Sequence, residues 1–231
     1  NAGIGGVASL VNGDRDEWER VFNVNWLGVY YGTRTFMPAL VAAEDGYLVN
    51  TSSINGFWAA LGPNVPHTAY ASAKFAVKGF TEALVTDLRQ NAPHVKCAVV
   101  MPGHIGTAIM MNSRRILGHG TPEQMSSTEL EEMRAMIQQQ GVDASVISDS
   151  DLKAFVHQRR LDFQDKAPTT AASAATTILD GIRAEKWRIL VGKDAEVLDS
   201  MVRESPEDAY ESEFLEKLFA QGHLTDLVPH E

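Results

Sequence analysis

The sequence predicts an α/β fold of the doubly wound type, in which helices cover both faces of a parallel sheet. Residues 46–53 and 95–101 are short and almost continuously apolar, as strands covered on both faces are. Helical segments alternate with these strands along most of the chain, which is the pattern of βαβ units. A length of 231 residues fits one domain with a substantial core. We therefore expect residues 1–231 to form a single domain.

Apolar periodicity and capping residues predict the individual helices. Residues 14–43 should form one long helix, in which Asp14 or Asp16 caps the start and Pro38 kinks the helix or ends it early. The middle of this helix is apolar on nearly every side, which indicates burial against two neighbours. The remaining predicted elements of the alternating pattern are helices at residues 69–90, 169–184, 194–202 and 206–221 and a strand at residues 187–191.

Residues 110–166 interrupt this alternation with a helical insertion. Residues 127–140 predict an amphipathic helix, for which Thr128 and Glu131 offer a capping box, and residues 151–160 predict a second short helix. Two interpretations of the insertion stay open. It is either a surface segment with a small core of its own or a lid over a substrate pocket.

The composition argues against several classes of function. The formal net charge of −10 disfavours nucleic acid or an anionic membrane as a partner, because both would repel the protein. The chain shows no signal peptide, no apolar run of membrane-spanning length and no metal-ligand spacing, so we expect a cytoplasmic protein without a metal. Cys97, the single cysteine, lies in an apolar run and is expected to be a buried structural thiol.

The most informative motif is Tyr70-Ala-Ser-Ala-Lys74. Residues four apart share one face of a helix, so the phenol and the ammonium can act on the same bound atom. Ser53 closes one predicted strand and Pro102-Gly103 follows the next. All of these groups should therefore meet at the carboxyl ends of the parallel strands, where such sheets bind their ligands. Together a phenol, an ammonium and a hydroxyl can move a proton to or from a carbonyl or alcohol oxygen.

The phenol of Tyr70 needs activation for this task. A free tyrosine has a pKa of about 10, so proton transfer near neutral pH requires a shift worth about 3 to 4 kcal/mol. One ammonium at about 4 to 5 Å supplies roughly that much at an effective dielectric constant of about 20. We therefore expect Lys74 to lower the pKa of Tyr70.

Five motifs in chain order support a resemblance to a known family. They are Asn1-Ala2-Gly3, Asn25 within the long helix, Ser53, Tyr70-x-x-x-Lys74 and Pro102-Gly103. With these motifs, residues 1 to about 110 resemble a short-chain dehydrogenase/reductase, a family with a Rossmann-like fold, and the rest fits its topology more loosely. The resemblance implies an oxidoreductase that transfers a hydride between NAD or NADP and a small-molecule substrate.

The same resemblance implies roles for individual residues. Tyr70 would be the general acid/base, Lys74 its activator and ribose anchor, and Ser53 the group that polarises the substrate oxygen. Asn25 would hold the water that links Lys74 to solvent. The cofactor-binding residues that the resemblance implies are Asn1, Ala2, Gly3, Tyr70, Lys74, Pro102, Gly103, Ile105 and Thr107.

Some of these residues also have a simpler explanation, which the sequence leaves open. Ser52 competes with Ser53 for the catalytic role. Asn25 could bend its helix through a backbone hydrogen bond, and Thr107 could cap a helix.

Apolar residues on both sides of the expected site predict the class of substrate. Phe57 and Trp58 precede the tyrosine motif, and Met110 follows the Pro-Gly turn. As lining of a substrate pocket they favour a lipophilic ketone or secondary alcohol. His67 and His104 flank the site and are interpreted as surface residues of substrate loops rather than catalytic groups.

The glycine-rich phosphate-binding turn of the family, Gly-x-x-x-Gly-x-Gly, is not found in this chain. We expect the missing portion to be on the order of 80 to 90 residues, at about 30 residues per βαβ unit, including the residues that select NAD or NADP. A second class of function therefore stays open, a cofactor-free fragment or a non-catalytic interaction protein derived from this fold. Helix pairing in the family, on the helices of Asn25 and Tyr70, implies a homodimer or homotetramer.

Overall fold

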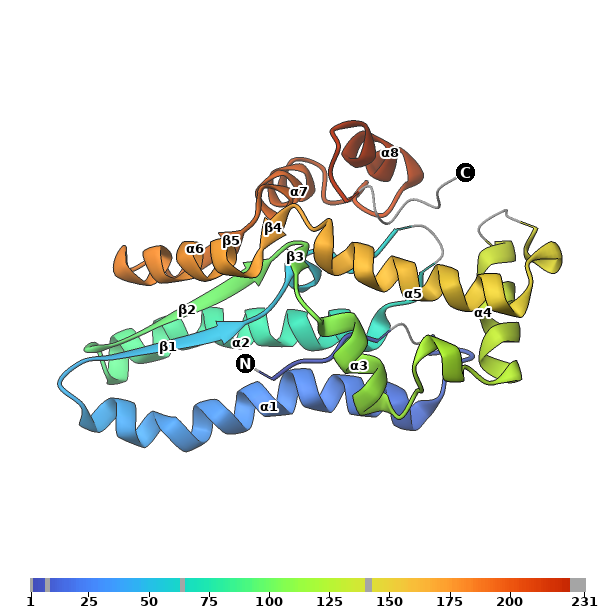
Figure 1. The fold of residues 1–231 in the computed structure, drawn as a ribbon. Helices are drawn as coiled ribbons and strands as arrows, with labels where there is room; N and C mark the ends of the chain where they lie inside the picture. The colour runs from blue at the N-terminus through green and yellow to red at the C-terminus, as the bar shows by residue number, and fades with distance from the viewer. Residues whose placement is uncertain (1, 7–8, 63–64, 140–142, 225–231) are drawn as a thin grey trace.

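The computed structural model describes residues 2–6, 9–62, 65–139 and 143–224, and it confirms the predicted α/β architecture (Figure 1). Three strands form a parallel sheet in the order β1–β2–β5. Their registers place Gly46 beside Val95 and Val99 beside Arg188. All three strands therefore end at the same edge of the sheet. The strands are β1 (Gly46–Thr51), β2 (Val95–Pro102) and β5 (Arg188–Val191).

Helices cover both faces of this sheet, as the doubly wound prediction requires. Helices α1 (Arg15–Ala42) and α2 (Thr68–Asn91) lie on one face, and α6 (Ala171–Arg183) and α7 (Lys193–Glu204) on the other (Figure 1). The alternating side chains of β2 serve both layers. Ala98 and Val100 pack with the α6 side, whereas Val95 and Cys97 pack with the α2 side. Helix α8 (Ser212–Ala220) follows α7.

Cys97 is a buried structural thiol, as predicted. Its side chain is 6% exposed, and its Sγ lies 3.7 Å from the main-chain oxygen of Thr81. Burial raises the pKa of the Cys97 thiol to about 11, which keeps it protonated and unreactive at neutral pH.

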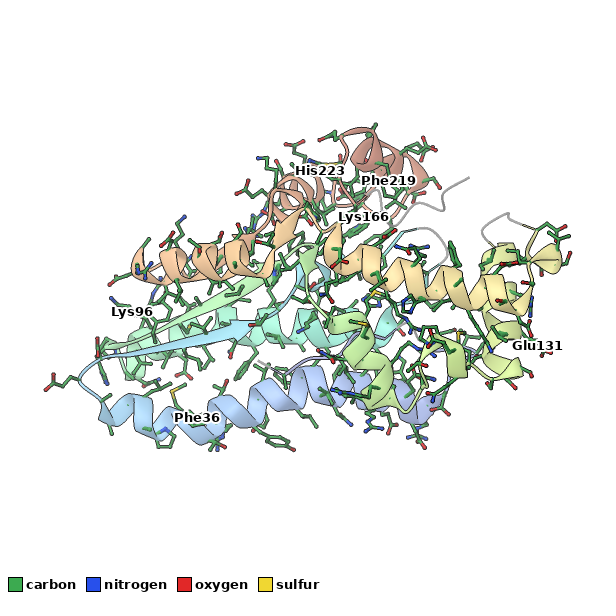
Figure 2. All side chains as sticks on the ribbon, viewed as in Figure 1. Phe36, Lys96, Glu131, Lys166, Phe219 and His223 are labelled. Atoms are coloured by element: carbon green, nitrogen blue, oxygen red, sulfur yellow. The ribbon has the colours of Figure 1, made fainter. Side chains whose placement is uncertain are left out.

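Helix α1 begins where its cap predicts. The Asp14 carboxylate accepts a hydrogen bond of 2.8 Å from the main-chain nitrogen of Glu17. The helix continues past Pro38 to Ala42, so the proline does not end it early. The expectation that its apolar middle is buried on nearly every side is wrong, because Tyr31 is 59% exposed. Figure 2 labels Phe36, which is also exposed on this helix.

The insertion leaves and rejoins the domain at one point. The two-residue strands β3 (Ile105–Gly106) and β4 (Thr169–Thr170) pair in parallel and close it off. Between them the insertion has its own core, in which Leu130 packs with Leu152. Its helical elements are α3 (Ile109–Leu117), η2 (Pro122–Gln124), α4 (Ser127–Gln139), η3 (Ala144–Val146) and α5 (Asp149–Asp165).

Three local details differ from what the sequence predicts. Helix α3 was not predicted. The start of α4 is capped by Ser126 and Glu129, which exchange hydrogen bonds, rather than by Thr128 and Glu131. Residues 206–211 are not helical, so α8 begins six residues later than the apolar pattern suggested.

Candidate active site

Tyr70 and Lys74 lie one turn apart in the first half of α2, at the carboxyl edge of the sheet. The Lys74 Nζ is 5.3 Å from the centre of the Tyr70 ring and donates a hydrogen bond of 3.1 Å to the main-chain oxygen of Thr51, the last residue of β1. The lysine is 5% exposed, and burial lowers its pKa to about 8. The pair therefore faces the end of β1, as the motif predicts.

The expected effect of Lys74 on the phenol is not seen in this structure. Burial raises the pKa of Tyr70, and the nearby Ser53 hydroxyl opposes part of that rise. Burial is the larger of these two effects, and the Lys74 ammonium lies over the ring and donates its hydrogen bond to the Thr51 oxygen. Tyr70 is therefore a protonated phenol at neutral pH.

The structure separates the two adjacent serines. Ser52 is buried, and its hydroxyl donates a hydrogen bond of 2.7 Å to the main-chain oxygen of Lys74. Ser53 is also buried. Its hydroxyl accepts a hydrogen bond from the main-chain nitrogen of Asn55 and lies close enough to the Tyr70 phenol to act on its pKa. Of the two serines, Ser53 is therefore the one beside the phenol, and its catalytic role stays a prediction.

Asn25 is completely buried and connects two segments of the site. Its Nδ2 donates to the main-chain oxygens of Ile4, at 2.7 Å, and Val21, at 2.8 Å. The second of these bonds is the backbone contact of the simpler explanation. Its Oδ1, however, has no partner among the described residues. A Cβ placed on Gly3 would lie 3.1 Å from this oxygen and 3.9 Å from the Lys74 Nζ.

The N-terminal segment therefore reaches the site. Ala2 and Gly3 are exposed there, and Asn1 lies outside the described residues. Glycine at position 3 brings a main chain close to Asn25 and Lys74, and a larger residue would crowd the asparagine oxygen. This is the kind of cradle in which a ligand can approach the backbone.

The turn after β2 lies at the same edge of the sheet. Pro102 ends the strand, and the main-chain nitrogen of Gly103 donates a hydrogen bond of 2.9 Å to the main-chain oxygen of Val191 in β5. Ile105 belongs to β3, where it packs partly buried against the core of the α6 layer. Thr107 is exposed and is not a helix cap, because the N-cap of α3 is Ala108.

The prediction that Trp58 lines the substrate pocket is wrong. Trp58 is fully buried and packs against Phe214. Its Nε1 donates a hydrogen bond of 2.7 Å to the main-chain oxygen of Ala209. It belongs to the core beneath the C-terminal helices and cannot line a pocket. Phe57 is only partly buried at the edge of the same core, and Met110 is 43% exposed on α3.

Two histidines interpreted as surface residues are instead buried, each 6% exposed. The Nδ1 of His67 is 2.9 Å from the main-chain oxygen of Gly6, and its ring lies 4.8 Å from that of Tyr70. Burial lowers the pKa of His67 to about 4, so the ring is neutral. The main-chain nitrogen of His104 donates a hydrogen bond of 2.6 Å to Asp194. The sequence predicts only that residue 194 begins a helix.

The chief signal for these residues was positional. His67 is the N-cap of α2, three residues before Tyr70, and Asp194 follows the end of β5, at the edge where the ligands of parallel sheets bind. The described residues contain no group of three or more His, Cys, Asp or Glu side chains that could hold a metal ion. None of the described helices has the length and apolarity needed to cross a membrane.

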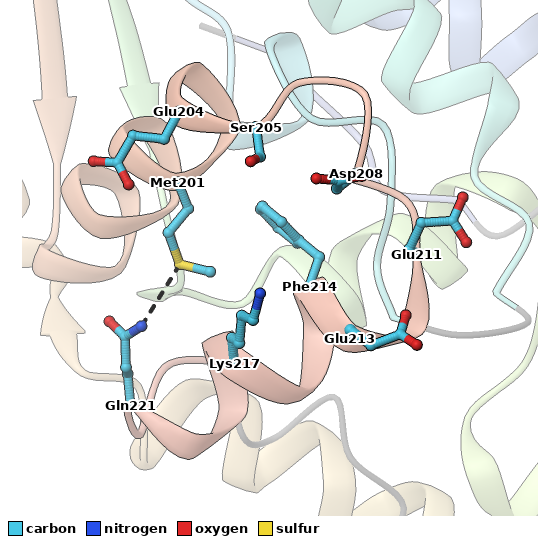
Figure 3. A pocket seen from close by; sticks show the side chains of 9 residues that line it. All are labelled: Met201, Glu204, Ser205, Asp208, Glu211, Glu213, Phe214, Lys217 and Gln221. Atoms are coloured by element: carbon cyan, nitrogen blue, oxygen red, sulfur yellow. Dashed lines mark hydrogen bonds between the residues drawn. The ribbon is translucent and has the colours of Figure 1, made fainter.

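A separate pocket of about 420 Å³ lies between α7 and α8 (Figure 3). Carboxylates dominate its rim, while Met201 and Phe214 provide apolar surface. None of the residues that line it belongs to the site around Tyr70. The lining residues are Met201, Glu204, Ser205, Asp208, Glu211, Glu213, Phe214, Lys217 and Gln221.

The arrangement around Tyr70 agrees with the comparison to known families. The family model described as short chain dehydrogenase matches residues 1–117, half of the chain. The chain belongs to this family. Its Tyr70, Lys74, Ser53 and Asn25 all lie within the matched residues.

The chain is also similar to individual oxidoreductases. It is 31% identical to the protein named "Putative oxidoreductase SadH" of Mycobacterium tuberculosis over 205 residues, which are 88% of this chain and 60% of that protein. It is 37% identical to cyclopentanol dehydrogenase of Comamonas sp. over 108 residues, 46% of this chain and 40% of that one. The chain thus spans less than two thirds of the length of these relatives.

A solved structure supports the fold. The crystal structure of a short-chain dehydrogenase/reductase from Burkholderia phymatum in complex with NAD superposes with a TM-score of 0.58 at 24% identity. The superposition covers 90% of this chain and 64% of that one. It shows that the short-chain dehydrogenase fold extends over most of the chain, including residues beyond the 117 that the family model matches.

Proposed function

We propose that this chain provides the catalytic part of an NAD(P)-dependent oxidoreductase that interconverts a lipophilic ketone and a secondary alcohol. One observation supports this most directly: the phenol of Tyr70 lies beside the Ser53 hydroxyl and the Lys74 ammonium, next to the cradle at Gly3. Family membership makes an oxidoreductase the expected activity.

The protonation state of the site favours proton donation to a ketone. Tyr70 is a neutral phenol at pH 7, so it can donate its proton to the substrate oxygen as that oxygen gains charge. Ser53 would donate a hydrogen bond to the same oxygen and stabilise it. In this direction the Tyr70 O–H bond breaks and an alcohol O–H bond forms. A bound nicotinamide would supply the hydride to the carbonyl carbon, or accept it in the reverse reaction.

Lys74 and Asn25 would return the proton to Tyr70. The Lys74 ammonium has a pKa of about 8, close to the pH at which it must give up and regain a proton. The Oδ1 of Asn25 has no partner among the described residues and borders the same glycine as the Lys74 Nζ. A water held between them would satisfy that oxygen and connect the lysine to solvent.

The residues present fit a nicotinamide cofactor, although they leave the choice between NAD and NADP open. Ala2 and Gly3, together with Asn1, would line its adenosine side. The turn from Pro102 to Thr107 would hold its carboxamide end. Supporting this, Gly3 keeps the space beside Asn25 and Lys74 free of any side chain, and Thr107 is exposed rather than used as a cap.

Apolar side chains near the site support a lipophilic substrate. Met110 and Met111 are 43% and 41% exposed at the start of α3, and Phe57 is partly buried near Ser53. One relative is a dehydrogenase of cyclopentanol, an apolar secondary alcohol. These observations favour a substrate whose only polar group is the reacting oxygen.

We also propose that residues 110–166 act as the lid of this site. Helix α3 is tied to the cofactor side, because the Ser113 hydroxyl accepts a hydrogen bond of 2.7 Å from the main-chain nitrogen of Gly5. Its C-terminal end is linked to the rest of the insertion by Arg114, which forms an ion pair of 2.9 Å with Glu129. The insertion therefore connects the N-terminal segment with its own small core.

The exposed face of α1 and α2 supports assembly into a homodimer or homotetramer. A glycine within a helix costs about 1 kcal/mol relative to alanine, so three of them on two helices need a reason. Cβ atoms placed on Gly28, Gly32 and Gly79 would meet nothing within 4 Å in this chain. Tyr31 and Phe75 are exposed on the same two helices. Close approach of the same helices from a second copy would explain both features.

An activity assay tests the proposed function. Purified protein is mixed with NADH or NADPH and with cyclopentanone, a long-chain methyl ketone or pyruvate, and loss of reduced cofactor is followed. We expect turnover with the apolar ketones. Preference for pyruvate would overturn the substrate class. If the protein neither binds nor oxidises either cofactor, the result would favour a cofactor-free fragment instead.

A further inference from the structure

Asp194 is a buried carboxylate for which the proton-transfer chemistry above has no use. It is the second residue of α7 and is 2% exposed. Its Oδ2 accepts a hydrogen bond of 2.6 Å from the main-chain nitrogen of His104, and its Oδ1 has no partner among the described residues. Burying a carboxylate with so few partners is costly, although the start of a helix offsets part of that cost.

Two glycines make room for this carboxylate. A Cβ placed on Gly103 would lie 2.1 Å from the Oδ2 of Asp194, and one on Gly192 would lie 2.4 Å from its Oδ1. Gly192 also has a φ of +102°, which disfavours other residues. The two glycines follow the ends of the neighbouring strands β2 and β5. The carboxylate therefore fits between the two strand ends only because neither glycine carries a side chain.

The main chain that Asp194 holds is also fixed from the other side. The Nε2 of His104 is 2.7 Å from the main-chain oxygen of Phe163, and the two rings lie 4.2 Å apart. Phe163 belongs to the last turn of α5, so His104 joins the turn after β2 to the insertion. Asp194 thus fixes the residue through which the two are connected.

We propose that Asp194 is a positioning residue that sets the turn at residues 103–107 in the place where the nicotinamide end of the cofactor binds. This inference rests on the proposed function. Asp194 would act through the main chain rather than by contact with the cofactor. It fixes the main chain at His104, and the groups that hold the carboxamide follow within three residues. A short side chain on the first turn of a rigid helix limits the movement of that turn.

The same helix offers a matched control. Asp199 is also buried, at 8% exposed, but its carboxylate pairs with Arg188 and Arg203 rather than with the turn. Replacing Asp199 with asparagine removes the charge from these two ion pairs and should lower the melting temperature. Only the change at Asp194 should act on the nicotinamide end of the cofactor.

The test compares ligands with and without a nicotinamide ring. Dissociation constants of NAD⁺ and NADP⁺, and of ADP-ribose and its 2′-phosphate, are measured by calorimetry for the full chain, Asp194→Asn and Asp199→Asn. We expect Asp194→Asn to weaken binding of the preferred dinucleotide about tenfold and to leave its nicotinamide-free counterpart within twofold. Asp199→Asn should leave both unchanged.

A second variant covers the case in which Asp194→Asn fails to fold. Gly103→Ala pushes the carboxylate from the opposite side and should weaken the same dinucleotide selectively. Equal binding ratios in wild type and both variants would overturn the inference, as would an equal loss in Asp199→Asn. If the wild type binds the nicotinamide-free ligand without preferring the dinucleotide, only this inference fails and the proposed function is not contradicted. If it binds no nucleotide, the proposed function fails as well.

Discussion

The hydroxyl of Ser52 donates a hydrogen bond of 2.7 Å to the main-chain oxygen of Lys74, so the serine next to the proposed catalytic one has a structural task. A Cβ placed on Gly56 would lie 2.2 Å from this hydroxyl and 2.9 Å from the same Lys74 oxygen. Ser52 and Gly56 together therefore bring the turn after β1 into close contact with α2. This contact leaves Ser53 to face Tyr70.

The two serines should respond differently to alanine substitution. Ser53→Ala removes the hydroxyl beside the phenol and should lower turnover about 10²- to 10³-fold with little change in melting temperature. Ser52→Ala leaves a buried carbonyl without its hydroxyl partner and should cost about 1 to 3 kcal/mol of stability. Steady-state kinetics and urea unfolding on both variants check this. A larger loss of turnover in Ser52→Ala would reverse the assignment.

Tyr70→Phe should abolish proton transfer and leave the fold intact. We expect turnover to fall about 10²- to 10⁴-fold, because the substituted ring keeps its packing against His67 but has no proton to donate. Tyr47→Phe is the control, since the Tyr47 hydroxyl donates to the main-chain oxygen of Lys186, away from the site. Retained turnover in Tyr70→Phe would rule out the tyrosine as the acid.

Lys74→Met should stabilise the protein while inactivating it. Burial lowers the pKa of Lys74 from 10.5 to about 8, so the charged form costs folding free energy at every pH below about 8. The cost disappears as the pH rises from about 8 to 10.5. At pH 7 we expect a gain of at most about 3 kcal/mol, reduced by the lost hydrogen bond to Thr51.

Urea unfolding of wild type and Lys74→Met at pH 7 and pH 10 measures this effect. Lys78→Met is the control, because Lys78 is only partly buried and pairs with Glu82 at 3.0 Å. It should bring no comparable gain. A less stable Lys74→Met at pH 7 would contradict the prediction.

His67 should make the protein sensitive to mild acid. Burial lowers its pKa from 6.5 to about 4, so the unfolded chain binds a proton between these values while the folded one does not. Stability should therefore fall as the pH drops from about 6.5 to 4, by up to about 3 kcal/mol from this group. Comparing the unfolding of wild type and His67→Gln at pH 7 and pH 5 isolates it. Identical losses in the two proteins would exclude His67 as the source.

Assembly through α1 and α2 predicts a specific interface variant. Gly28→Arg places a long charged side chain on the open face and also improves helix propensity, so the chain should stay folded. We expect wild type to sediment as a dimer or tetramer and the variant as a monomer. Leu179→Arg changes a residue that is 50% exposed on α6 and should not alter the assembly. A wild type that sediments as a monomer would contradict the proposed interface.

Local patterns were sufficient for the fold class, and they predict the main residues of the candidate site. The spacing of Tyr70 and Lys74 fixes both on one helix face, and Ser53 lies at a strand end, whatever the rest of the chain does. Boundaries were less well predicted. Pro38 does not end its helix early. Met37 and Leu40, on either side of it, pack against the core around Val95, which keeps this part of α1 on the sheet.

The sequence alone therefore determined which chemical groups are present, on which type of element, and to which family the pattern belongs. Only the tertiary structure decided where they point. It directed Lys74 at the Thr51 oxygen, buried Trp58 in the core, and brought Asp194 to His104 across 90 residues of sequence. Helix and strand periodicity is encoded within a few neighbouring residues. Contacts between distant residues depend on how the strands pair and how the helices pack, which no short stretch of sequence contains.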